Sequence, residues 1–302
     1  MVTRCKVWRP KNLQEAWSIH SQTGIDQSCF VSGGTWLRTQ WEAGLLNSPS
    51  DIISLESLEE LKKIIVQRTE NNQEFVKIGS STTIADCIKN PILRKNTEAL
   101  VMSCEKIAAP SIRNQATIGG NILTAVGDTL PALLIYDAEL TWYDGKLFES
   151  ELLEKWLITR QFEPHKNETR LLVHINIPLE ENSKKSFYFH KKIGRRKTFT
   201  PAIVSVAGKG KINNLNNFQS VTLAVGGGSS LPIKLFEAER VLNGFPFSLS
   251  LLKKVHTAIF DEYVVVSDAF MTDQYKKTVA ANLITAELCN IVEQGGDQNA
   301  VG

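Results

Sequence analysis

Two pairs of adjacent glycines, each placed after a short apolar run, most constrain the folds open to this chain. Residues 31–37 read VSGGTWL and residues 115–121 read QATIGGN. Glycine has no Cβ and adopts positive φ at little cost, so an anion can approach the backbone N–H groups of such a turn. A tight turn uses the same residues, so each pair alone is ambiguous. Two such turns that converge in space would hold both phosphates of a dinucleotide.

The common phosphate-binding motifs are missing from the sequence. No G-x-G-x-x-G opens a helix near the start, and no G-x-x-x-x-G-K-[ST] occurs anywhere. The sequence therefore supports neither a Rossmann crossover nor a P-loop. A third glycine-rich stretch, AVGGGSS at 224–230, follows a late strand and predicts a hairpin turn.

Composition narrows the class of protein. The 302 residues suit two or three packed lobes, with 42% hydrophobic and 22% charged residues. The formal net charge of +2 gives no reason to expect nucleic acid as a partner, although KKIGRRK at 191–197 is a local basic cluster. The sequence shows neither a secretory signal nor a run of roughly 18 apolar residues that could span a membrane. We therefore expect a cytoplasmic protein.

Cysteine and histidine do not form a metal-binding pattern. The five cysteines are scattered without a C-x-x-C pair, and no two of the five histidines lie four residues apart. This spacing suits neither zinc nor an iron–sulfur cluster, so we expect reduced, mostly packed thiols and no metal site. The cysteines are Cys5, Cys29, Cys87, Cys104 and Cys289.

The first 179 residues alternate strand-like and helix-like patterns, which is typical of α/β or α+β folds. The segment 57–69 reads as an amphipathic helix, with Ser57 as N-cap and Glu60 three residues later. The segment 117–125 reads as a strand, a glycine turn and a new element. Further helices are expected at 12–22, 84–90, 99–108, the start of 130–144, and 151–160; strands are expected at 28–32, 51–55, 75–79, the end of 130–144, and 169–179.

A polar segment at 180–186 marks a domain boundary. Three strand-like runs follow at 186–193, 202–212 and 220–228, and then three helical runs at 235–244, 248–263 and 272–292. Strands followed by helices predict a separate α+β lobe with an antiparallel sheet. The expected organisation is a domain at 1–179, with parts at about 1–55 and 56–179, a second domain at 183–292, and a frayed tail at 293–302.

The order of several motifs resembles the FAD-binding subunit of molybdenum hydroxylases, a family that includes the FAD subunits of xanthine dehydrogenase and carbon monoxide dehydrogenase. The resemblance runs over roughly residues 1–290. It implies an α+β fold, with a two-part FAD-binding domain of the vanillyl-alcohol-oxidase/PCMH type followed by an antiparallel sheet plus helices. The motifs are SGGTWL at 32–37, IRNQATIGGNILTA at 112–125, Gly127-Asp128, and Lys191 with Arg195.

The resemblance also implies roles for single residues. One loop would bind the FAD pyrophosphate through backbone groups and lead into a helix, and the second loop would bind the pyrophosphate and ribityl chain from the other side. Asp128 would bond to the adenosine ribose or nearby polar groups, Leu172 would pack near the flavin, and Lys191 would lie near the isoalloxazine. The first loop comprises Ser32, Gly33, Gly34, Thr35 and Trp36; the second comprises Thr117, Gly119, Gly120, Asn121 and Thr124.

Several of these roles have structural alternatives. Asp128 is also suited to cap a helix in the following segment TLPALLIY at 129–136, and Lys191 to lie solvated on a strand. Arg113 is expected to fix its loop rather than touch the flavin. The segment before Asp128 is about two residues shorter than the family pattern, which leaves the partner of Asp128 open. Thr200 and Pro201 stand where the family carries an acidic residue.

The resemblance implies an oxidoreductase subunit. FAD would take electrons from [2Fe-2S] clusters on a small partner subunit, and a large partner subunit would bind molybdopterin. A xanthine or purine substrate and NAD as acceptor are expected. A self-contained FAD-dependent oxidase or reductase is the alternative, but residues 183–290 offer no acid–base grouping for a substrate. A nucleotide-binding or assembly protein without a redox role is the third hypothesis.

Overall fold

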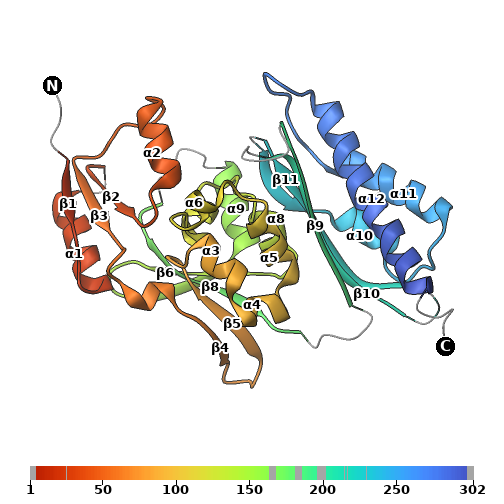
Figure 1. Ribbon diagram of the computed structural model, residues 1–302, viewed down its shortest axis with the longest axis horizontal. Helices are drawn as coiled ribbons and strands as arrows, with labels where there is room; N and C mark the ends of the chain where they lie inside the picture. The colour runs from red at the N-terminus through yellow and green to blue at the C-terminus, as the bar shows by residue number, and fades with distance from the viewer. Residues whose placement is uncertain are drawn as a thin grey trace. The chain divides into compact units, whose positions relative to one another are not determined.

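The computed structural model describes residues 5–24, 26–162, 168–180, 186–195, 202–213, 215, 217–228 and 230–297, with backbone alone over 294–297. The chain divides into two compact units, shown in Figure 1. The first unit comprises Met1–Leu93, Ala108–Thr124 and Asp137–Leu179; the second comprises Arg94–Ile107, Ala125–Tyr136 and Glu180–Gly302. Two short segments from the first 179 residues thus pack with the C-terminal part of the chain.

The first unit begins with a parallel three-stranded sheet, in which β3 lies between β1 and β2. The strand at the centre carries fully buried Ile53, and fully buried Ala16 of helix α1 belongs to the same apolar cluster. Asn12 caps α1 by accepting a hydrogen bond from the Glu15 N–H. The elements are β1 (Lys6–Trp8), α1 (Leu13–Thr23), β2 (Ser28–Val31), α2 (Thr35–Glu42) and β3 (Asp51–Ser54).

An antiparallel five-stranded sheet completes the first unit, in the order β4-β5-β8-β6-β7. Its central strand β8 reads LLVHINIP and is buried at Leu171, Leu172, Val173, Ile175 and Ile177. The strands are β4 (Ile64–Arg68), β5 (Glu74–Gly79), β6 (Glu139–Tyr143), β7 (Phe148–Leu152) and β8 (Leu171–Pro178). The helices along this part of the chain are η1 (Glu59–Lys62), α3 (Ile84–Lys89), α4 (Pro91–Asn96), α6 (Pro110–Arg113), α7 (Ile118–Leu123) and α9 (Leu153–Phe162).

Two predicted elements were wrong. The segment 57–69 is not a helix: it forms η1 and then strand β4, because the run Ile64-Ile65-Val66 is β-branched and pairs with β5. Ser57 does not cap a helix there; its hydroxyl donates to the Pro10 carbonyl. The segment 117–125 is not a strand and turn, because it forms the short helix α7. Strands β1, β7 and β12 were not predicted.

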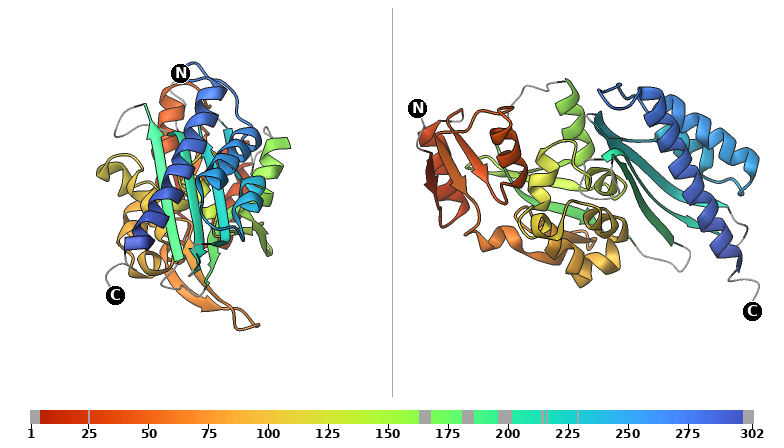
Figure 2. Two further views of the ribbon diagram at one scale, coloured as in Figure 1. Left: turned by 90° about the vertical axis from the view of Figure 1, so that its right-hand side faces the viewer. Right: turned by 45° about the horizontal axis from the view of Figure 1, so that its top comes forward.

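The second unit confirms the predicted antiparallel sheet followed by helices. Its strand order is β12-β11-β10-β9, and the β11–β12 hairpin turns at Gly227 and Gly228 as the sequence predicted. Figure 1 and both views of Figure 2 show α11 and α12 along one face of this sheet, while Figure 1 shows α5 and α8 on the other. The elements are α5 (Glu98–Glu105), α8 (Leu130–Leu134), β9 (Ser186–Gly194), β10 (Ala202–Ile212), β11 (Phe218–Gly227), β12 (Ser230–Lys234), α10 (Phe236–Leu242), α11 (Leu249–Glu262) and α12 (Asp273–Asp297).

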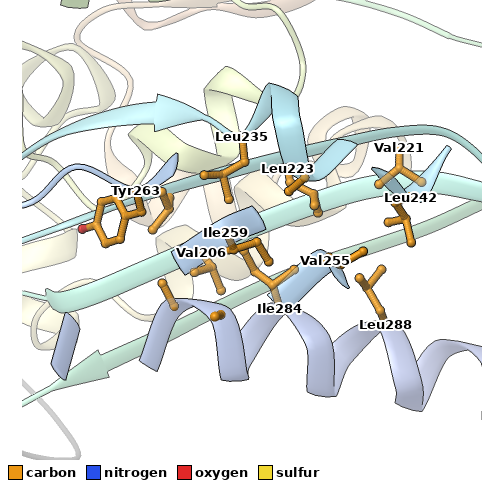
Figure 3. Packing of buried hydrophobic residues seen from close by; sticks show 14 of the residues in the cluster. Val206, Val221, Leu223, Leu235, Leu242, Val255, Ile259, Tyr263, Ile284 and Leu288 are labelled. Atoms are coloured by element: carbon orange, nitrogen blue, oxygen red, sulfur yellow. The ribbon is translucent and has the colours of Figure 1, made fainter. Parts of the chain in front are cut away.

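The helices pack on the sheet through a continuous apolar core (Figure 3). Val206 and Leu223 of the strands meet Val255 and Ile259 of α11 and Ile284 of α12, all fully buried. Apolar burial contributes about 25 cal/mol per Å², so this layer stabilises the unit. The fold as a whole is α+β, as predicted.

Candidate functional site

The first glycine pair lies where strand β2 ends and helix α2 begins. Gly34 has φ 64°, a left-handed conformation that favours glycine, and it occupies the N-cap position without any side-chain cap. The N–H groups of Gly34, Thr35 and Trp36 therefore have no acceptor in the described part of the chain. The first glycine pair thus presents several hydrogen-bond donors at one place.

Side chains around this helix start add donors and no negative charge. The first turn of α2 contains no acidic residue, and Arg38 in the next turn pairs with Glu42 at 2.8 Å. Among the residues that the structure describes, neither the Ser32 nor the Thr35 hydroxyl has a protein partner. The partial positive charge at a helix N-terminus, about 0.5 elementary charge, favours an anion there.

The second glycine pair lies inside the first turn of α7, and its donors are already used. Thr117 is the N-cap, and its hydroxyl accepts from the Gly120 N–H at 3.2 Å. The Gly119 N–H donates to the Ser80 carbonyl at 2.9 Å, and the Asn121 N–H to the Thr117 carbonyl at 3.0 Å. This pair therefore differs from the first in its hydrogen bonding, although the dipeptide is the same.

Close backbone contacts bring the two glycine loops together. A Cβ on Gly33 would lie 1.9 Å from the Gln115 carbonyl oxygen, so only glycine lets the first loop pack on the second. A Cβ on Gly119 would lie 2.6 Å from the Ser80 carbonyl oxygen, so this glycine lets α7 pack beside β5. The convergence expected for the two loops is present within the first unit.

Gly120 differs from its neighbour because its Cα faces outward. It is exposed, and an added Cβ would meet only the Thr117 hydroxyl, at 3.0 Å. Along the same helix, the Thr124 hydroxyl donates to the Asn121 carbonyl at 2.8 Å, which closes the end of α7. The open face of α7 therefore begins at Gly120.

Two further residues of the first unit have mainly structural contacts. Leu172 is 3% exposed and lies opposite Trp142 in the sheet, at the point where the register shifts. The Arg113 guanidinium donates to the Ala108 carbonyl at 2.7 Å. Arg113 thus fixes its own loop, as the sequence predicted.

The remaining predicted residues, Asp128 and Lys191, belong to the second unit. Within that unit their side chains have different partners. The Asp128 carboxylate accepts a 2.5 Å hydrogen bond from Lys192, not from Lys191. Thr129, rather than Asp128, occupies the N-cap position of α8. Lys191 points the other way, pairs with Glu287 of α12 at 3.0 Å, and leaves 45% of its side chain exposed.

The sequence reasoning missed Lys192 and His190. His190 is 2% exposed and its Nε2 lies 3.1 Å from the Ser205 hydroxyl. Burial, and next the positive charge of Lys192, lower the pKa of His190 to about 3, so the imidazole is neutral. The alternation of side chains along FHKK could have shown that residues 190 and 192 share a face. Thr200 and Pro201 lie outside the described residues.

Neither a metal site nor a membrane span is found in the described residues. No three His, Cys, Asp or Glu side chains gather there in a way that could hold a metal ion. None of the helices in the same part of the chain is long and apolar enough to cross a membrane.

The first unit fits the diphosphate of a dinucleotide. The uncapped start of α2 supplies unpaired donors, and the exposed Gly120 on the adjoining loop leaves room that a side chain would fill. The groups at this place can donate hydrogen bonds to an anion, and none of those that the structure describes there is an acid, base or nucleophile poised for chemistry. Any redox chemistry at this site therefore comes from the bound group.

Two family descriptions match the chain. The family described as "FAD binding domain in molybdopterin dehydrogenase" matches residues 3–180. The family described as "CO dehydrogenase flavoprotein C-terminal domain" matches residues 189–288. Together they cover nearly all of both units.

Curated relatives and solved structures agree with these matches. The chain is 25% identical to the nicotinate dehydrogenase FAD-subunit of Eubacterium barkeri, over 94% of this chain and 95% of that one. It is 26% identical to a putative xanthine dehydrogenase FAD-binding subunit of Escherichia coli, over 78% and 79%. Carbon monoxide dehydrogenase from Hydrogenophaga pseudoflava has a similar fold, with a TM-score of 0.82, 20% identity, and 95% and 96% coverage.

Proposed function

The chain belongs to the family of FAD-binding domains of molybdopterin dehydrogenases, and from this premise we propose how its own residues serve a flavoprotein subunit. Its relatives are FAD subunits of molybdenum hydroxylases, so the chain is an oxidoreductase subunit that binds FAD.

We propose that the start of α2 binds the FAD diphosphate. The N–H groups of Gly34, Thr35 and Trp36, with the Ser32 hydroxyl, donate to phosphate oxygens. The observation that carries this proposal is the uncapped helix start, whose donors have no acceptor in the described part of the chain. Gly33 holds this loop against the second glycine loop through its close contact with Gln115.

The second loop serves the same cofactor through its shape rather than through its N–H groups. Gly120 gives the ligand access to the backbone, Gly119 and Thr117 keep α7 in place, and Asn121 and Thr124 line the continuing face. Leu172 contributes apolar surface. The roles of Asp128 and Lys191, which belong to the second unit, remain predictions from the sequence. The bound FAD supplies the chemistry, since it accepts electrons singly and releases them in pairs.

The partners and the reaction belong to the same proposal. A molybdopterin-binding large subunit and an iron–sulfur small subunit would assemble with this chain, with xanthine or a related purine as substrate and NAD as acceptor. Support comes from the family and from relatives whose names carry xanthine or nicotinate dehydrogenase. The cytoplasmic location remains a prediction from the sequence.

Titration of the purified chain with FAD and with FMN tests the diphosphate assignment. FMN carries the same isoalloxazine and ribityl chain but only one phosphate, so it lacks the diphosphate that α2 would bind. We expect the flavin fluorescence of FAD to fall on binding, and we expect FMN to bind about a hundredfold more weakly than FAD. Equal affinity for the two flavins would overturn the assignment to α2. Absence of binding by either flavin would overturn the proposed function.

A further inference from the structure

Helix α2 is completed at its C-terminus and open at its N-terminus. The C-terminus has the hydrogen bonds of a Schellman motif: the Leu45 N–H donates to the Gln40 carbonyl at 2.9 Å, and the Gly44 N–H to the Trp41 carbonyl at 3.1 Å. Gly44 has φ 68°, the left-handed conformation that this motif requires. At the N-terminus, Gly34 provides no side-chain cap. Within the described residues, what α2 lacks is therefore a set of acceptors at its start.

Packing contributes little to the stability of α2. None of its eight residues is buried, and within the described chain no other helix or strand packs extensively against it. Helix α9 of the same unit has ten residues and buries Leu153, Trp156 and Leu157. A helix shorter than about 12 residues is marginal in water unless packing stabilises it. By this criterion α9 is stable in the fold, whereas α2 needs a further partner.

The interactions inside α2 do not replace this packing. The ion pair between Arg38 and Glu42 is exposed, with 78% and 62% of the two side chains accessible, and such pairs contribute little. Thr39, at an exposed position within the helix, has a lower helix propensity than alanine. Without a ligand, α2 therefore has little to stabilise it.

We propose that α2 is mostly unfolded in the free chain and that FAD binding orders it, because the diphosphate supplies the acceptors missing at its start. This inference rests on the proposed function, which places the diphosphate there. The free N–H groups and the partial positive charge of the helix start both favour phosphate. Part of the binding free energy then orders the helix, so the observed FAD affinity depends on how readily α2 forms.

Two substitutions at Thr39 change helix propensity beyond the first turn of α2. Thr39→Gly and Thr39→Ala both remove the hydroxyl and differ by one methyl group, but glycine is much the weaker helix former. We expect FAD to bind Thr39→Gly about fivefold more weakly than Thr39→Ala, by fluorescence titration of the purified chain. Denaturant unfolding without FAD should be the same in both variants, because an unfolded α2 contributes nothing to it. Equal FAD affinities of the two variants would overturn the inference.

Thr159 of α9 provides the matched control. It is also exposed, and its hydroxyl donates to the Lys155 carbonyl at 3.1 Å. Because buried residues hold α9 in place with or without FAD, Thr159→Gly and Thr159→Ala should bind FAD within about twofold of each other. Their unfolding equilibrium constants without FAD should instead differ about fivefold. A fivefold difference in FAD affinity at Thr159 as well would show a general effect of stability and would contradict the inference.

Amide exchange inside α2 separates a failure of this inference from a failure of the proposed function. The Arg38 N–H donates to the Gly34 carbonyl at 2.9 Å and the Ala43 N–H to the Thr39 carbonyl at 3.1 Å, so both are protected when the helix is formed. We expect both to exchange rapidly in the free chain and to slow about tenfold or more with FAD. Slow exchange without FAD would overturn the inference but leave the diphosphate assignment standing. A chain that binds no FAD would overturn the proposed function, and this inference with it.

Discussion

Within the described part of the chain, the N–H groups at the first glycine pair have no acceptor, whereas those of the second pair donate to neighbouring residues of the fold. Gly34 opens α2 without a cap, but Gly119 and Gly120 donate to Ser80 and Thr117. In each pair the leading glycine packs against another backbone segment, Gly33 on Gln115 and Gly119 on Ser80. In both loops the leading glycine thus allows close backbone packing. The loops differ in whether the N–H groups at the glycine pair are already hydrogen-bonded.

This difference shows why a glycine motif alone does not identify a phosphate site. A glycine is required either where a neighbour approaches closely or where φ is positive, and both needs exist without any ligand. Binding is argued instead from donors that have no partner. By that criterion, the start of α2 is the phosphate site that we propose, and the start of α7 supports it by packing.

The largest expected effect concerns the leading glycines. Gly33→Ala places a Cβ 1.9 Å from the Gln115 carbonyl oxygen, and the backbone on both sides must shift. We expect the free energy of unfolding to fall by about 3 kcal/mol or more, measured by denaturant unfolding without FAD. Gly24→Ala is the contrast: its φ of 92° strains an alanine, but its Cβ would meet nothing within 4 Å, whereas Gly33 has no positive φ. A loss in Gly33→Ala no larger than the loss in Gly24→Ala would contradict a dominant steric contact at Gly33.

Gly120→Val tests the outward face of the second loop. The added Cβ would meet only the Thr117 hydroxyl, at 3.0 Å, and the side chain would fill space at the proposed FAD site. We expect FAD affinity to fall about a hundredfold while the unfolding free energy changes by less than about 1 kcal/mol, by titration and denaturant unfolding. Full FAD binding in this variant would remove the second loop from the site.

Strand β8, on which Gly119 packs through Ser80, carries His174. The protonation of His174 makes the stability of the fold depend on pH. Ser80, which accepts from Gly119, donates its own N–H to Val173 of β8 at 2.9 Å, next to His174. Burial, and next the charge of Lys77, lower the pKa of His174 to about 4 from an ordinary value of 6.5. The unfolded chain therefore binds the proton more tightly, and stability falls as the pH drops from about 6.5 towards 4.

Denaturant unfolding at several pH values measures this dependence. His174 should contribute about 1 to 2 kcal/mol of lost stability between pH 7 and pH 5, and His174→Gln should lack that part of the loss. His190, whose pKa is lowered to about 3, adds a loss of the same sign in the second unit that remains in the variant. An identical pH profile in His174→Gln would contradict the assignment.

The smallest expected effect concerns the cap of α7. Thr117→Val removes the hydroxyl that accepts from the Gly120 N–H but keeps the shape of the side chain. We expect a loss of about 1 kcal/mol in the unfolding free energy. Thr35→Val is the contrast at the first pair: its hydroxyl caps nothing, so its stability should change little. An unchanged unfolding free energy in Thr117→Val would contradict the distinction between the two loops.

Much of the fold followed from pattern, and the errors have physical causes. The alternating strand β8 and the strands and helices after residue 186 were predicted, because their periodicity is clear. The segment 57–69 was misread because its lysine and glutamate content favours a helix, while pairing with β5 draws Ile64–Arg68 into the sheet. The two segments that pack with the second unit could not be foreseen, because their contacts are with distant strands.

The candidate site was predicted by resemblance in its outline but not in its hydrogen bonding. The sequence predicted that both glycine pairs bind one ligand. It could not show that the N–H groups of the second pair already donate to Ser80 and Thr117. Lys191 and Lys192 are neighbours in sequence, and only the register of β9 shows which of them reaches Asp128. A shift of one residue exchanges the two faces of a strand.

Amide hydrogen exchange, resolved by residue with NMR and measured with and without FAD, separates the two glycine loops. We predict that the N–H groups of Gly34, Thr35 and Trp36 exchange rapidly in the free protein and become protected when FAD binds. The Gly119 N–H, which already donates to Ser80, should be protected in both states. Unchanged exchange at α2 together with new protection confined to α7 would mean that the phosphates do not bind at the start of α2.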